Sequence, residues 1–117
     1  MPTRRAKLFP TPEDAETAFY EAFERGDLAA MMAVWAESPD IVCVHPRGPR
    51  LTGFDAVRDS WAQIFAGGAA QLRVRATELR KFDGNSVAVH ALVEVLTSAA
   101  QPGTAAQSVC ATNVYEL

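Results

Sequence analysis

The stretch FYEAFERGDLAAMMAVWAESPDIVCVHPRGPRLTGFDAVRDSWAQIF (residues 19–65) decides the fold. It begins inside a helix that residues 11–14, TPED, should start, because a capping threonine, an early proline and two acids favour a helix N-terminus. Gly26 is expected to end this helix and Asp27 to cap a second one. The second helix should continue until the residue before Pro39, because proline pushes its predecessor out of the helical region.

The same stretch also predicts two short strands and a third helix. The run IVCVH at Ile41–His45 lies between prolines, is rich in β-branched residues, and is expected to form a strand buried on both faces. A turn and a second short strand, Arg50–Thr52, should follow it. After Gly53, large apolar side chains recur at helical spacing as far as Phe65, which predicts a helix that ends at Gly67.

The second half of the chain is expected to form sheet. Apolar and polar residues alternate over residues 72–77, and the alternation slips near Glu78, where we expect a β-bulge. The Asp-Gly pair at 83–84 is typical of a hairpin turn, and strands should occupy residues 87–96 and 109–117. These elements predict an α+β domain in which three helices pack on a curved, mostly antiparallel sheet. A ligand would sit in the concavity between the helices and the sheet.

The strand predicted over residues 87–96 is apolar on both of its faces. One face carries the valine column that begins at Val87, and the other carries His90, Leu92 and Glu94. Neither face suits open solvent, so we expect helices to cover one and a partner subunit to cover the other, giving a homodimer through the sheet. His90 is assigned to that subunit interface.

Composition excludes several classes of protein. The chain has 117 residues, with 11 basic and 14 acidic side chains and a net charge of −3. An acidic balance without a basic stripe argues against nucleic-acid binding, and no stretch reaches the roughly 20 apolar residues of a membrane helix. Two cysteines are too few for a disulfide framework. With no apolar segment behind the first basic residues, we expect a cytoplasmic protein with free thiols.

The order of elements, together with the quoted stretch, resembles the nuclear-transport-factor-2-like superfamily, which includes ketosteroid isomerases and SnoaL-like polyketide cyclases. The Gly26-Asp27-Leu28 junction, Trp35 before an acidic turn, and the Gly53…Val57…Trp61 spacing carry the resemblance. It implies a cone-shaped fold in a single domain over residues 11–117, after a flexible leader at 1–10. It also implies one more strand than this chain supplies. The superfamily hosts enzymes, binding modules and assembly domains, so the resemblance predicts fold better than function.

The resemblance can be followed position by position into the site. Ketosteroid isomerases place an aspartate base just before a proline at the end of the first strand, and His45 stands there. Their tyrosine donor on the first helix corresponds to Phe19, which cannot donate, and Tyr20 is expected to point elsewhere. Their second oxyanion donor, a protonated aspartate, corresponds to Asn113, whose amide can donate. Steroid isomerisation is therefore not implied, but a site with a histidine and an amide is.

His45 is the principal candidate for chemistry, because an imidazole serves as a general base near neutral pH without much adjustment. The alternative is a histidine that hydrogen-bonds the loop backbone and fixes the turn at Pro46. A Cys43–His45 nucleophile and base pair is disfavoured, since residues two apart lie ~6.6 Å apart along a strand. The two histidines have no metal-ligand spacing, so neither a metal nor a cofactor is expected.

The remaining candidate residues are aromatic or small. The resemblance places Phe19, Trp35 and Trp61 in the wall of the pocket, with Cys43, although an aromatic stripe at helical spacing is more often core. Two functions stay open. In the first, His45 moves a proton on a small, mostly apolar carbonyl compound while Asn113 stabilises the oxyanion, in an isomerisation, cyclisation or dehydration without a cofactor. In the second, the domain binds a ligand without turnover or assembles as a dimer.

Overall fold

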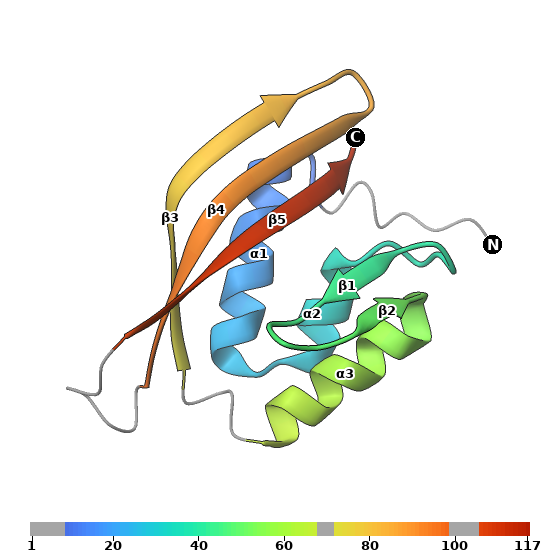
Figure 1. Cartoon of the computed structure of the whole chain (residues 1–117). Coiled ribbons are helices and arrows are strands. Elements are labelled where there is room, and N and C mark those ends of the chain that lie inside the picture. The colour runs from blue at the N-terminus through green and yellow to red at the C-terminus, as the bar shows by residue number, and fades with distance from the viewer. Residues whose placement is uncertain (1–8, 68–71, 99–105) are drawn as a thin grey trace.

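The computed structural model describes residues 9–67, 72–98 and 106–117. Most of the predicted leader, residues 1–8, lies outside the described residues. The elements, in chain order, are α1 (Pro12–Arg25), α2 (Leu28–Val34), β1 (Val42–Val44), β2 (Arg50–Thr52), α3 (Phe54–Ala66), β3 (Leu72–Asp83), β4 (Val87–Ser98) and β5 (Gln107–Glu116). This confirms the predicted α+β order, with three helices packed on an antiparallel sheet (Figure 1).

Local chemistry sets the junction between the first two helices as predicted. The backbone N–H of Asp14 donates to Thr11 Oγ1 at 3.1 Å, which caps the start of α1. Gly26 ends α1 in the left-handed conformation, with φ of 65°. Asp27 Oδ1 then accepts from the backbone N–H of Ala30 at 3.0 Å and caps α2.

The end of α2 differs from the prediction. The helix stops at Val34, and Trp35 already has extended backbone angles. Leaving the helix early places the Trp35 ring edge-on against Phe19, with ring centroids 6.4 Å apart. Tertiary aromatic packing therefore ends this helix before Pro39 does.

The first hairpin forms a small sheet of its own, in which β1 and β2 pair antiparallel. The prediction that β1 is buried on both faces is wrong. Only Cys43 is buried, whereas Val42 is 48% exposed and Val44 62% exposed. The β-branched composition predicted a strand correctly, but it does not report which faces the rest of the fold covers.

The main sheet has the strand order β3–β4–β5, and all neighbours are antiparallel. Its register shifts between Thr77 and Arg80, where Glu78 has a positive φ of 54°, so the predicted bulge is confirmed. The predicted hairpin is also present, since β3 ends at Asp83 and the Gly84 N–H donates to the carbonyl of Val87 at 2.8 Å. Helix α1 lies across the inner face of this curved sheet (Figure 1).

The two faces of β4 have different surroundings in the structure. His90 is fully buried and faces α1, where its Nδ1 lies 2.8 Å from Glu16 Oε2. The assignment of His90 to a subunit interface is therefore wrong, because α1 covers the face on which it lies. The opposite face carries the valine column, and beside it Phe82 and Val114 are each 62% exposed.

Two groups of buried side chains hold the domain together. One lies among the helices and β1 and consists of Ala22, Met31, Met32, Cys43, Val57 and Trp61. The other lies between α1 and the main sheet, where Tyr20 packs with Val74 and Leu92. Phe19 and Phe23 pack against both groups, so α1 is buried on two sides. Within the described residues, no helix is long and apolar enough to cross a membrane.

Candidate functional site

His45 follows β1 and is held from the other side by α3. Its Nε2 lies 3.0 Å from Ser60 Oγ, and its ring meets Trp61 edge-on with centroids 4.9 Å apart. The Ser60 hydroxyl in turn donates to the carbonyl of Val57 at 2.6 Å, one turn back along α3. Helix α3 therefore positions the His45 imidazole through the Ser60 hydroxyl, which already donates its hydrogen to the carbonyl of Val57.

This geometry determines which nitrogen of His45 carries the proton. A serine hydroxyl has one hydrogen, and Ser60 spends it on Val57, so its oxygen can only accept from His45. Nε2 must then be the protonated nitrogen, and Nδ1 keeps its lone pair. No partner for Nδ1 is recorded among the described residues. Burial lowers the pKa of His45 below its ordinary value, which keeps the ring neutral at neutral pH.

Cys43 lies closer to His45 than its spacing along the strand predicts. The two side chains share one face of the chain, and Sγ reaches Nε2 at 3.6 Å. The distance argument against the pair is thus wrong, because side chains from the same face can lean together. The chemical conclusion still holds for another reason. Burial raises the pKa of the Cys43 thiol to about 11, and the protonated Nε2 cannot take a proton from it.

The aromatic residues expected in the pocket wall form one cluster, in which Trp61 is the ring that contacts His45. Phe19 packs edge-on against Trp61 with centroids 5.7 Å apart, and against Trp35 on another side. Phe23 and Phe65 also contact the Trp61 ring. The four predicted residues, Phe19, Trp35, Cys43 and Trp61, belong to or pack against the helical core group.

Asn113 lies in a different cluster, between α1 and the sheet. Its Nδ2 donates to the Tyr20 hydroxyl at 3.1 Å, and that hydroxyl donates to Glu94 Oε2 at 2.7 Å. The expectation that Tyr20 points elsewhere is wrong, since Tyr20 is the residue of α1 that reaches Asn113. In the part of the chain that the structure describes, no hydrogen bond or ring contact joins His45 to Asn113. A chain of aromatic rings separates them, because Phe19 contacts Tyr20 on one side and Trp61 on the other.

A second polar cluster adjoins Asn113 at the start of α1. Glu16 Oε2 accepts from the Tyr115 hydroxyl at 3.0 Å and pairs with His90, while Glu13 pairs with Lys81 at 2.8 Å. Burial raises the pKa of Glu94 in the neighbouring cluster, and burial with Glu16 nearby raises that of Tyr115. These groups connect α1 to β3, β4 and β5.

Sequence reasoning missed Ser60, Tyr20, Glu94 and Glu16. Glu94 offered a signal, because an acid within an apolar column needs a partner when it is buried. Ser60 offered none, since one serine on an amphipathic helix is common. Among the described residues, no group of three or more potential ligands could hold a metal ion.

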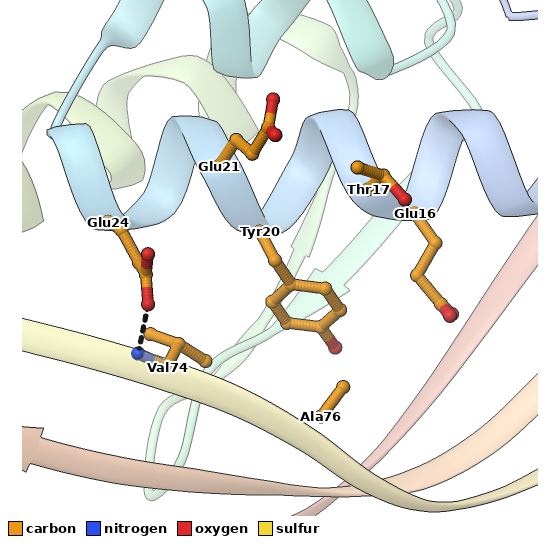
Figure 2. Close-up of a pocket in the computed structure, with 7 residues that line it drawn as sticks. All are labelled: Glu16, Thr17, Tyr20, Glu21, Glu24, Val74 and Ala76. Carbon is orange, nitrogen blue, oxygen red and sulfur yellow. Dashed lines mark hydrogen bonds between the residues drawn. The ribbon is translucent and has the colours of Figure 1, made fainter.

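Two surface hollows lie outside the aromatic cluster. One, of about 260 Å³, lies between α1 and β3 and is lined by Glu16, Thr17, Tyr20, Glu21, Glu24, Val74 and Ala76. Figure 2 shows Tyr20 turned toward β3 and Glu24 accepting from the Val74 N–H, at 2.8 Å. The other, of about 410 Å³, lies around Pro39 and the start of α3. Neither hollow is lined by His45 or Asn113.

Comparisons with known proteins agree with this fold. A family model described as the SnoaL-like domain matches residues 13–117. The chain is similar to a Thiobacillus denitrificans structure provisionally described as a calcium/calmodulin-dependent protein kinase type II association domain. The two are 38% identical with a TM-score of 0.80, over 92% of this chain and 84% of that chain. No curated protein matches.

Two further solved structures give the same picture. A Streptomyces avermitilis protein, provisionally described as a dehydratase of the nuclear-transport-factor-2-like family, is 29% identical with a TM-score of 0.73, over 87% of this chain and 80% of that chain. A Pseudomonas putida protein, provisionally described as a polyketide cyclase, is 17% identical with a TM-score of 0.56, over 88% and 80%. The last shows the fold alone. The chain belongs to the SnoaL-like domain family, within the nuclear-transport-factor-2-like superfamily.

Proposed function

We propose that the domain binds a small, mostly apolar carbonyl compound and that His45 moves a proton on it without a cofactor. The observation that supports this is the hydrogen-bonded series from His45 through Ser60 to Val57, which leaves Nδ1 of a neutral imidazole as a base. Around this base the surroundings are aromatic and apolar, which suits a ligand of the same character.

The reaction class follows from what a single neutral base can do. Removal of a proton beside a carbonyl group opens isomerisation, cyclisation and dehydration, and none of these needs a redox cofactor. The dehydratase description of the 29% identical structure is consistent with that range. Asn113 stays a predicted second polar group of the domain, in the cluster between α1 and the sheet, where its amide donates to Tyr20.

Proton transfer can be tested with a substrate that needs only a base. In 5-nitrobenzisoxazole, a base removes the ring C–H proton while the N–O bond breaks, which gives a coloured cyanophenolate. A positioned base contributes about 10²–10⁴-fold on its own substrate, and we expect His45→Ala to lose about tenfold on this substitute. The wild-type rate should rise with pH and reach half of its plateau value below the ordinary histidine pKa, because burial lowers the pKa of His45.

The matched control is Arg50→Ala, an exposed change on β2 that should leave both the rate and the pH profile unaltered. Circular dichroism would establish that His45→Ala is folded. Equal rates for wild type and a folded His45→Ala would refute proton transfer by this residue.

A second candidate function is assembly through the outer face of the sheet. The cross-strand partners of Val89 are Phe82 on β3 and Val114 on β5, so these three apolar side chains form one row on the face away from α1. Phe82 and Val114 are largely exposed in the single chain. The similarity to a structure described as an association domain favours this candidate as well. It is compatible with a ligand site on the inner side of the same sheet.

We expect the wild-type protein to sediment as a homodimer, at about twice its 12.6 kDa mass, because an exposed apolar row of this kind is commonly covered by a partner. Val114→Glu should shift it to monomer, since two carboxylates would be buried at a two-fold interface. Ala29→Glu places the same charge on an exposed position of α2 and should leave the dimer intact. A wild-type monomer at micromolar concentration would contradict the assembly candidate.

A further inference from the structure

Each of the two tryptophans in the aromatic cluster has a buried indole N–H that donates to no acceptor among the described residues. Nε1 of Trp61 and Nε1 of Trp35 are both buried, and neither has a hydrogen-bond partner among the described residues. Buried donors are almost always paired in native proteins, so two orphans in one cluster call for an explanation. We propose that these indole N–H groups bind the acceptor oxygen of a ligand beside His45, which rests on the proposed function and specifies its ligand class.

The position of the two rings supports a common site. Trp61 is 3% exposed and its ring contacts the His45 ring, so the residue that carries this N–H adjoins the proposed base. Phe19 packs against Trp61 and Trp35 alike, so the two donors belong to the same cluster. An apolar ligand body would meet aromatic walls, and its oxygen would meet the donors.

Within residues 9–67, 72–98 and 106–117, no acceptor forms a hydrogen bond with either of these donors. The side chains that pack around them are aromatic, aliphatic or sulfur-containing, and the Ser60 oxygen already accepts from His45. The third buried nitrogen without a hydrogen-bond partner among the described residues belongs to His90 and has a nearby acceptor. Nε2 of His90 lies 3.8 Å from a carboxylate oxygen of Glu13, and a small movement of that exposed side chain would pair it.

The donor chemistry selects an uncharged acceptor oxygen. An indole N–H carries no formal charge, and a carboxylate brought into an aromatic cluster would lose its hydration without gaining a counter-ion. A ketone, aldehyde or ester oxygen is desolvated more cheaply. When His45 removes a neighbouring proton, that oxygen becomes more negative, and fixed donors in apolar surroundings then bind it more strongly.

The chain has two tryptophans, so a ¹⁵N-labelled sample gives two indole N–H signals in an NMR correlation spectrum. The probes are cyclohexanone and methylenecyclohexane, which have the same shape but carry C=O and C=CH₂ respectively. We expect cyclohexanone to move the Trp61 indole proton downfield, saturably, because a new acceptor deshields it. Methylenecyclohexane should leave that proton near its starting position.

The variant Trp61→Phe keeps an aromatic ring and removes the donor. It should weaken cyclohexanone binding about tenfold, which corresponds to one hydrogen bond, and leave methylenecyclohexane binding unchanged. Dispersed backbone amide signals establish that the variant is folded. If cyclohexanone shifts neither indole signal, or if both probes shift them equally, the inference is overturned.

These outcomes are separable from those of the proposed function. If cyclohexanone does not shift the indole signals but proton transfer depends on His45, the donor site alone is overturned. A saturable indole shift with an unchanged rate in His45→Ala would overturn proton transfer alone and leave a ligand-binding site.

Discussion

Replacing Trp61 with alanine is expected to lower the free energy of unfolding by about 3–5 kcal/mol, the usual cost of deleting a buried tryptophan. The indole is almost fully buried, and its ring contacts Phe23 at 5.1 Å and Phe65 at 5.5 Å between centroids. It also supports His45 and Phe19. Because small domains are stable by only about 5–15 kcal/mol, this change removes a large share of the total.

Urea denaturation followed by circular dichroism measures this effect. Trp61→Phe is the matched comparison, because it keeps much of the contact area and should cost far less than alanine. A loss below about 1 kcal/mol for Trp61→Ala would contradict close packing of the cluster.

The elements that depend on short-range chemistry could be predicted from the sequence. Thr11 and Asp27 cap helices, Gly26 ends one, and the slipped alternation at Glu78 marks a bulge, all within a few residues of the structure they determine. The end of α2 could not be predicted in this way. Trp35 leaves the helix to pack against Phe19, and nothing near Trp35 in the sequence reports that contact.

At the candidate site, too, residue types could be predicted from the sequence, whereas contacts between distant elements could not. His45 and the two tryptophans could be proposed from residue type and position, but the protonated nitrogen of His45 depends on Ser60, which lies on another element. The contact of Tyr20 on α1 with Asn113 on β5 could not be predicted from the sequence. The helix is in fact buried on two sides, so that adjacent Phe19 and Tyr20 serve different clusters.

Glu16→Ala is expected to destabilise the domain by about 2–4 kcal/mol, because the fully buried His90 loses its acceptor, which costs about 1–3 kcal/mol, and the half-buried Tyr115 hydroxyl adds a smaller loss. One oxygen of Glu16 lies 2.8 Å from Nδ1 of the fully buried His90 and accepts the Tyr115 hydroxyl at 3.0 Å. His90 is fully buried in the intact domain, so its Nδ1 has Glu16 and not water as its partner.

Two other variants separate this cause from simple loss of charge on α1. Glu16→Gln retains an acceptor oxygen and should cost less than alanine, whereas Glu21→Ala removes an exposed carboxylate from the same helix and should cost little. The urea concentrations at the midpoints of unfolding rank the stabilities of the three variants. Equal losses for Glu16→Ala and Glu21→Ala would show that His90 and Tyr115 find other partners. Because β4 and β5 also carry Glu94 and Asn113, the larger loss at Glu16 would identify its cluster as the anchor that holds α1 and Tyr20 over that part of the sheet.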